Sequence, residues 1–123
     1  MQGLVVLGST GSIGRQTLEV VRRFPDRLRV IGLAAGSNLA LLRQQIEEFQ
    51  PELGFFLGNE SPAAIAVKGG HRFVSMEEMV THPAASLVMV GTVGKVGLSP
   101  PLAAIQARKA VALANKEVIV MAG

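Results

Sequence analysis

Short apolar runs and helix-like segments alternate along this chain, and no Asn-Gly turn separates any two of the runs. Antiparallel strands are often joined by such tight turns, whereas parallel strands need a crossover, usually a helix. The alternation therefore predicts βαβ units and a doubly wound α/β fold, with a mainly parallel sheet and helices on both of its faces. The expected strands are residues 4–7, 29–34, 53–57, 72–74, 87–93 and 110–114.

Helical periodicity occupies the segments between these strands. The first helix is expected to end at Pro25 and the second to be capped by Asn38. Ser61, Ser75 and Ser99 mark further helix starts, the last of a helix that runs to about residue 109. The positions of the first helix that we expect to face the core are Ile13, Thr17, Val20, Val21 and Phe24.

Composition favours a single packed domain that works in the cytoplasm. The 123 residues are 49% hydrophobic and 17% charged, and none of them is cysteine. No apolar run approaches the roughly 20 residues of a membrane span, and the N-terminus has no signal-peptide pattern. The net charge is only +3, the cations are scattered, and the aromatic residues are five phenylalanines. This pattern disfavours nucleic acid or a membrane as the partner.

A glycine-rich turn, GSTGSIG at residues 8–14, lies between the first strand and the first helix. Gly8 permits a sharp exit from the strand, Gly11 a close approach of a pyrophosphate, and Gly14 close packing of the helix on the strand. The helix N-terminus favours an anion there, and the hydroxyl groups of Ser9, Thr10 and Ser12 add donors. The GxxGxxG spacing is a variant of the Rossmann fingerprint and not a P-loop. It predicts dinucleotide binding; the alternative is a tight turn without a ligand.

The end of the second strand bears on the choice of dinucleotide. NAD-binding folds usually carry an acid there for the ribose hydroxyls, whereas this chain reads AAGSN at residues 34–38. Asp26 lies at the other end of that strand. Backbone N–H groups, a hydroxyl and an amide would accept a 2′-phosphate, so NADP is favoured over NAD. In the alternative reading, Ser37 and Asn38 are only a helix cap.

Later segments add weaker signals at the same expected edge of the sheet. Gly94 and Gly97 either let the nicotinamide end pass or form a plain loop. Residues 115–117 follow the last strand and either bind substrate or nicotinamide ribose or form an ordinary loop. His71 and His82 have no partner in an evident motif and are interpreted as surface residues. Periodicity does not settle the type of the final segment, and its apolar residues indicate the front piece of a longer protein.

Four motifs in order carry a resemblance to a known family: GSTGSIG at 8–14, AGSN at 35–38, GxxGLxP at 94–100 and LANKE at 113–117. Together they resemble the 1-deoxy-D-xylulose 5-phosphate reductoisomerase family. The resemblance implies an NADPH-dependent rearrangement and reduction that gives 2-C-methyl-D-erythritol 4-phosphate in the non-mevalonate isoprenoid pathway. It also implies a Mg²⁺ or Mn²⁺ requirement, a homodimer, and a metal site beyond residue 123, so that no metal ligand is expected in this chain.

The resemblance also assigns roles to individual residues. Members differ at Ser37, where some have Lys or Arg, and Lys95 receives no role. Lys116 is the one residue for which a catalytic contact with substrate or nicotinamide is expected. The assigned groups are Thr10, Gly11, Ser12 and Ile13 for the pyrophosphate and adenosine side, Gly36, Ser37 and Asn38 for the 2′-phosphate, and Asn115, Lys116 and Glu117 for the nicotinamide and the substrate.

Residues 1–123 are therefore predicted to be the NADPH-binding domain of a longer enzyme, inactive by themselves, with the sugar phosphate bound through a domain that is absent. One alternative is the cofactor domain of another NADP-dependent oxidoreductase, such as a semialdehyde dehydrogenase. The other is a stand-alone nucleotide-binding module without catalysis.

Overall fold

The structure is a computed structural model of the chain, and it describes residues 2–36, 38–56, 72–91, 99–113 and 118–121. Its strands are β1 (Gln2–Leu7), β2 (Leu28–Ala35), β3 (Leu53–Phe56), β4 (Arg72–Phe73), β5 (Leu87–Val90), β6 (Ala110–Leu113) and β7 (Val118–Met121). Its helices are α1 (Ser12–Arg23), α2 (Leu39–Phe49), α4 (Met76–Val80) and α6 (Ser99–Gln106).

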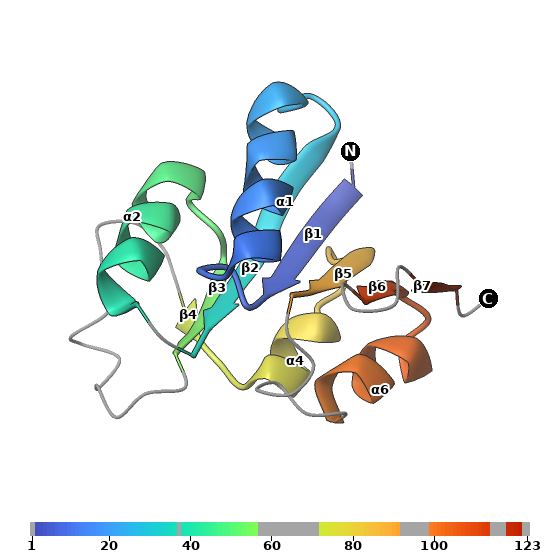
Figure 1. Cartoon of the computed structure of the whole chain (residues 1–123). Helices are drawn as coiled ribbons and strands as arrows, with labels where there is room; N and C mark the ends of the chain where they lie inside the picture. Colours follow the sequence, from blue (N-terminus) through green and yellow to red (C-terminus); the bar gives the residue numbers. More distant parts are fainter. Residues whose placement is uncertain (1, 37, 57–71, 92–98, 114–117, 122–123) are drawn as a thin grey trace.

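The strands of the described part form one sheet in the order β4-β3-β2-β1-β5-β6-β7. All neighbours pair in parallel except β6 and β7, which are antiparallel. Helices α1 and α2 cover one face of the sheet, and α4 and α6 cover the other (Figure 1). The predicted doubly wound fold is therefore confirmed. Strand order reverses between β1 and β5, and in such sheets this switch point is where ligands bind.

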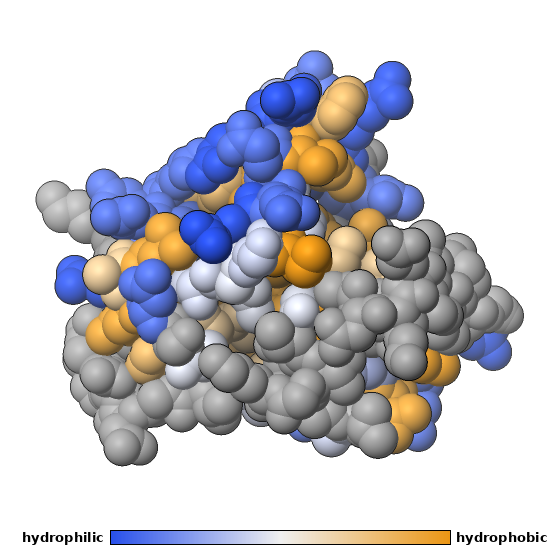
Figure 2. Space-filling model, in the orientation of Figure 1, coloured by the Kyte–Doolittle hydropathy of each residue, from blue (hydrophilic) through white to orange (hydrophobic). Residues whose placement is uncertain are grey.

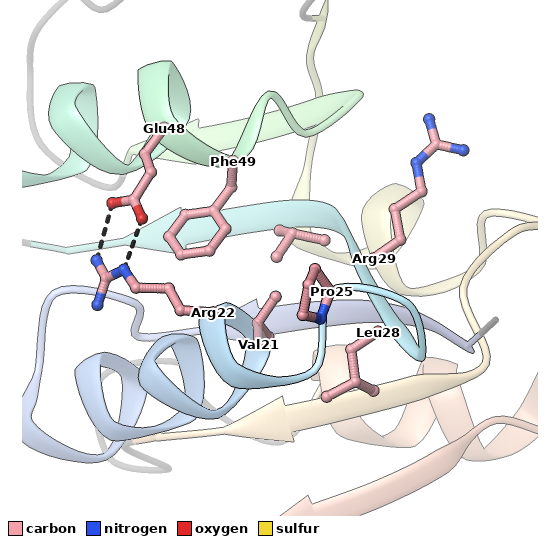
Figure 3. A pocket seen from close by; sticks show the side chains of 8 residues that line it. Val21, Arg22, Pro25, Leu28, Arg29, Glu48 and Phe49 are labelled. Atoms are coloured by element: carbon pink, nitrogen blue, oxygen red, sulfur yellow. Dashed lines mark hydrogen bonds and ion pairs between the residues drawn. The ribbon is translucent and has the colours of Figure 1, made fainter.

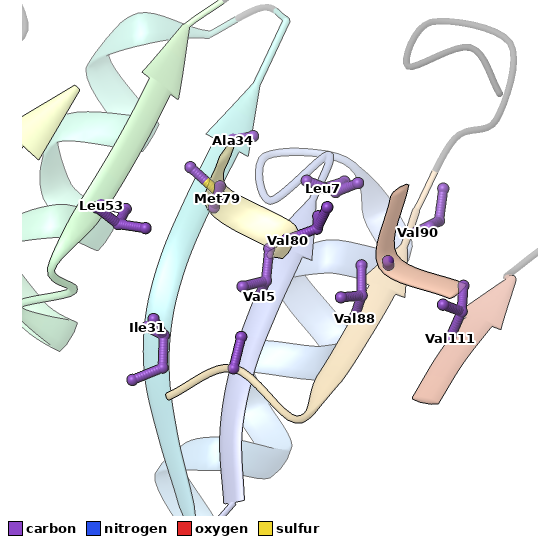
Figure 4. Packing of buried hydrophobic residues seen from close by; sticks show 12 residues of the cluster. Val5, Leu7, Ile31, Ala34, Leu53, Met79, Val80, Val88, Val90 and Val111 are labelled. Carbon is purple, nitrogen blue, oxygen red and sulfur yellow. The ribbon is translucent and has the colours of Figure 1, made fainter. Parts of the chain in front are cut away.

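Strand β1 shows why a continuous apolar run is needed at the centre of the sheet. Val5 and Leu7 pack in the cluster beneath α4, next to Met79 and Val80 (Figure 4). The alternate residues Leu4 and Val6 belong to a second cluster, on the side of α1 and α2. Because both faces of the strand are buried from Gly3 to Leu7, polar side chains are disfavoured at these positions, and the polar residue of the strand, Gln2, lies at its exposed start.

The buried face of α1 differs from the prediction. Gly14, Leu18 and Val21 are buried, whereas Val20 and Phe24 are 46% and 48% exposed. The predicted stripe was right at Val21 and wrong at Val20 and Phe24, because the start of the helix sets its rotation. Gly14 packs against the turn that precedes α1, and positions four and seven residues further on then face the sheet.

The later elements follow the predicted order with shifted ends. Ser75 caps α4 by accepting a hydrogen bond from the N–H of Glu78, while α6 stops at Gln106, before the predicted end. The segment at 118–121, whose type the sequence left open, is a strand paired with β6. The helix expected from Ser61 lies outside the described residues. Within those residues, no helix has the length and apolar character needed to cross a membrane.

Candidate nucleotide-binding site

The glycine-rich turn begins with a sharp bend at Gly8. Its φ of 90° lies in the region that L side chains rarely adopt, as the predicted role of this glycine requires. The N–H groups of Gly8 and Ser9 both donate to the carbonyl of Ala34, at 2.7 and 2.9 Å. The N–H of Gly11 then donates back to the carbonyl of Gly8, at 3.2 Å. The chain therefore leaves β1 tied to the end of β2.

Two further glycines let backbone segments meet at this turn. A Cβ on Gly14 would lie against the carbonyl oxygen of Gly8 and 2.6 Å from the Cα of Ser9. A Cβ on Gly91, directly after β5, would lie 3.2 Å from the carbonyl oxygens of both Leu7 and Gly8. The N–H of Gly91 donates to Leu7 at 2.7 Å. Sequence analysis missed Gly91; a glycine directly after a strongly apolar strand was the available signal.

The N-terminus of α1 opens away from the sheet at this point. Gly11 is its N-cap, with φ −79° and ψ 176°, and no side chain of the described residues caps the helix. The first main-chain bond of the helix runs from Arg15 to Gly11, so the N–H groups of Ser12 and Ile13 have no acceptor within it. In Figure 2, residues of near-neutral hydropathy lie at the foot of α1, whose outer face is hydrophilic. Two N–H groups without acceptors in the helix, together with the helix dipole, favour an anion at this end.

Ser9 does not act as predicted. Its side chain is fully buried, and its Oγ has no hydrogen-bond partner among the described residues. The predicted role as a hydroxyl donor to a ligand was therefore wrong, because the side chain points into the protein. Its carbonyl instead accepts a hydrogen bond of 2.9 Å from Nε2 of Gln45, a buried residue of α2. Sequence analysis missed Gln45 because a glutamine in a helix is usually a surface residue.

The end of β2 reaches the same edge of the sheet. Gly36 is exposed, and Asn38 adopts φ 57° and ψ 64°, a left-handed conformation that asparagine tolerates better than most residues. Its Oδ1 accepts a hydrogen bond from the N–H of Leu41, which confirms the predicted cap. No acidic residue stands in the first turn of α2, and Asp26 is exposed before β2 begins. Ser37 lies outside the described residues.

Other predicted residues are not brought into this site. Asn115, Lys116 and Glu117 lie outside the described residues, as do Gly94, Lys95, Gly97 and His71. His82 was predicted to be a surface residue, but its side chain is only 19% exposed, and its Nε2 lies 2.8 Å from Oε2 of Glu52. The tertiary fold creates that pair at the amino edge of the sheet, far from the glycine-rich turn. In the part of the chain that is described, no cluster of three or more His, Asp or Glu side chains can hold a metal ion.

A hollow of about 420 Å³ lies at the edge of the sheet opposite the glycine-rich turn, between the C-terminal ends of α1 and α2 (Figure 3). Arg22 spans its rim through two hydrogen bonds to Glu48, at 2.6 and 2.8 Å, and its guanidinium lies over the ring of Phe49. The guanidinium lowers the pKa of the Glu48 carboxyl below its ordinary value. Because Arg22 is already paired, we assign this hollow to the α1–α2 contact and not to the nucleotide site.

Comparisons with known proteins decide the family. The family model for 1-deoxy-D-xylulose 5-phosphate reductoisomerase matches residues 4–123. The chain belongs to this family. A 1-deoxy-D-xylulose 5-phosphate reductoisomerase from Pelotomaculum thermopropionicum is 43% identical over 131 residues, covering 100% of this chain and 34% of the relative. One from Geobacter sp. strain M21 is 47% identical over 130 residues, with the same coverage.

Solved structures of the reductoisomerase family show the same fold. A crystal structure of DOX-P reductoisomerase in complex with NADPH, fosmidomycin and magnesium superposes with a TM-score of 0.85 at 33% identity, covering 95% of this chain and 31% of that one. This chain thus spans about a third of the length of the reductoisomerases that it matches.

Proposed function

We propose that residues 1–123 form the NADPH-binding domain of an enzyme that converts 1-deoxy-D-xylulose 5-phosphate to 2-C-methyl-D-erythritol 4-phosphate. The observation that carries the proposal is the glycine-rich turn at the switch point of the sheet, where α1 presents N–H groups without acceptors in the helix. Family membership supports it, because a matched reductoisomerase was solved with NADPH. Family membership also favours this proposal over the two alternatives from the sequence, a semialdehyde dehydrogenase and a stand-alone nucleotide-binding module.

The geometry of the turn fits a pyrophosphate. Among the described residues, only the carbonyl oxygen of Gly8, at 3.6 Å, lies within contact of a Cβ position on Gly11, so a ligand can approach the backbone there. We propose that the N–H groups of Ser12 and Ile13 bind the pyrophosphate, with Thr10 beside them. Charge-assisted hydrogen bonds from a helix N-terminus to a phosphate are among the stronger ones in proteins.

We place the 2′-phosphate at the start of α2, beside Gly36, Ser37 and Asn38. The helix dipole favours an anion there, and no carboxylate in the first turn opposes it. The amide of Asn38 uses its oxygen for the cap, which leaves its N–H₂ group as a donor. The same absence of an acid removes the usual partner of the free ribose hydroxyls of NAD.

The cofactor preference of the chain gives a direct test. We expect NADPH to bind at least about ten times more tightly than NADH, a difference of about 1.4 kcal/mol, because only NADPH carries the phosphate. Isothermal calorimetry of the 123-residue chain with each cofactor measures both constants. 2′-AMP and 5′-AMP serve as matched probes, and only 2′-AMP should compete with NADPH at the α2 end. Equal or tighter binding of NADH would contradict the proposal.

The chemical step needs groups from outside the described residues. NADPH supplies the hydride, and we propose that Lys116, with Asn115 and Glu117, contacts the nicotinamide and the substrate. Mg²⁺ or Mn²⁺ would polarise the oxygens of the substrate and would be held beyond residue 123. A homodimer and a cytoplasmic location complete the proposal; the first comes from the family resemblance and the second from the composition.

A polypeptide of residues 1–123 should therefore show no turnover. Hydride transfer requires the substrate carbonyl to be held against the nicotinamide, and a cofactor domain by itself does not impose that geometry. The assay is NADPH oxidation, followed by its absorbance, with Mn²⁺ and 1-deoxy-D-xylulose 5-phosphate. The control is a full-length reductoisomerase under the same conditions. Oxidation by the short chain that depends on both substrate and metal would refute this division of labour.

A further inference from the structure

We infer that Gln45 is a positioning residue for the cofactor: its buried side chain fixes the glycine-rich turn in the shape that receives the pyrophosphate. The inference rests on the proposed NADPH binding and adds to it a residue that does not touch the ligand. It starts from one contact, the 2.9 Å hydrogen bond that Nε2 of Gln45 donates to the carbonyl of Ser9.

The position of this hydrogen bond lets it fix the orientation of one peptide group in the glycine-rich turn. The N–H of Ser9 is tied to Ala34 of β2, and its carbonyl is tied to Gln45 of α2. A trans peptide is planar, and its C=O and N–H groups point in opposite directions within the plane. Holding the carbonyl of Ser9 therefore also fixes the direction of the N–H of Thr10. The chain enters Gly11 and α1 directly after this peptide. The amide of Gln45 therefore sets the course of the backbone at the proposed ligand-binding turn.

Because Gln45 is buried, water cannot easily replace its hydrogen bond to the carbonyl of Ser9. Gln45 is 4% exposed, between Leu42 and Ile46, which pack in the core cluster on this face of the sheet. Water has little access to the carbonyl of Ser9 in its place, and an unpaired buried carbonyl is unfavourable. Without Gln45, rotation of the Ser9–Thr10 peptide toward solvent would lower the free energy of the domain, because the carbonyl of Ser9 could then bond to water. That rotation would disturb the turn where the pyrophosphate must lie.

The helix that carries Gln45 also begins at the proposed 2′-phosphate site. Asn38 caps α2, and Gln45 lies two turns further along the same helix. One rigid element thus adjoins the 2′-phosphate end of the site and, through Gln45, holds the pyrophosphate end.

Replacement of Gln45 by methionine separates positioning from stability. Methionine keeps the length of the side chain, and it removes both the donor and Oε1, which has no partner among the described residues. We expect Gln45→Met to weaken NADPH binding at least about tenfold by calorimetry, because pyrophosphate donors that are out of place lose charge-assisted hydrogen bonds. Binding of 2′-AMP, which has no pyrophosphate, should change less than about twofold. A side chain that merely fills space would affect both ligands alike.

Two matched variants serve as controls. Gln44→Met makes the same change at the exposed neighbour, and Arg22→Met loosens the α1–α2 contact at the opposite edge. Both should bind NADPH as the unmodified chain does, with circular dichroism confirming the fold of all three variants. A Gln45→Met chain that binds NADPH as tightly as these controls would overturn the inference while leaving the proposed function standing.

The unmodified chain provides a readout that needs no variant. In NMR spectra, the side-chain amide of Gln45 should exchange slowly with solvent and shift when NADPH is added, whereas that of Gln44 should do neither. Rapid exchange together with an unchanged shift would overturn the inference even if Gln45→Met failed to fold. If the unmodified chain fails to bind NADPH at all, the proposed function is wrong, and the inference that rests on it is wrong as well.

Discussion

Replacement of Gly11 by valine should abolish NADPH binding and leave the domain folded. Gly11 has φ −79° and ψ 176°, a conformation open to L residues, and the nearest atom of the described residues to its Cβ position, apart from its chain neighbours, is 3.6 Å away. The Cβ of the new side chain therefore makes only ordinary contacts with the described residues, while the valine occupies the space through which a pyrophosphate must approach. We expect at least a hundredfold loss in affinity by calorimetry, about 2.7 kcal/mol, with an unchanged circular dichroism spectrum.

Gly11→Ala is the graded companion of this variant and should weaken binding less, because a single methyl group projects less far. Retained NADPH binding by the folded Gly11→Val chain would show that the pyrophosphate lies elsewhere. Loss of fold would instead show that Gly11 has a structural role that its open surroundings do not indicate.

The same change three residues later should have the opposite character. In Gly14→Val, the Cβ would meet the carbonyl oxygen of Gly8 and lie 2.6 Å from the Cα of Ser9. Both are backbone atoms of a turn that β2 and β5 hold in place, so the helix itself must move away. Such overpacking typically lowers the free energy of unfolding by about 1–3 kcal/mol, and a clash with fixed backbone puts this variant toward the upper end of that range.

Urea denaturation measures the effect of Gly14→Val, with Gly11→Val as the matched control for the substitution itself. A clearly lower midpoint for Gly14→Val alone is the expected result. Equal midpoints for the two variants would mean that α1 can slide along the sheet, and the close packing at Gly14 would then have no structural importance.

Local patterns in the sequence were sufficient to predict the parallel sheet, the bend at Gly8 and two of the helix caps. Apolar runs separated by helical segments indicate a parallel sheet, and that sheet is present with β1 at its centre. Gly8 was interpretable because a turn directly after a strand needs a positive φ, and it has one. Asn38 and Ser75 were found as caps because their side chains act within three residues of their own positions.

Features that depend on tertiary contacts were not predictable in this way. Gln45 and Ser9 meet across 36 residues, and nothing near either one indicates the other. The pair between His82 and Glu52 arises likewise from the packing of separate segments. The exposure of Val20 and Phe24 follows from how α1 is seated at Gly14, which its hydrophobic pattern does not specify. At 118–121, β-branched residues fit a strand, but only the partner β6 decides it.

The central strand pair, β1 and β5, has a consequence for folding. The hydroxyl of Ser86 donates to the carbonyl of Gly3 across 83 positions of sequence, so this pair closes a long loop and forms late. Gly91, which lies against Leu7 and Gly8 at the glycine-rich turn, reaches this position only when β5 pairs with β1. A partly folded chain with only β1, β2 and α1 in place would have the glycine-rich turn without Gly91 beside it. We therefore expect NADPH to stabilise the finished domain by slowing its unfolding and to leave its folding rate unchanged.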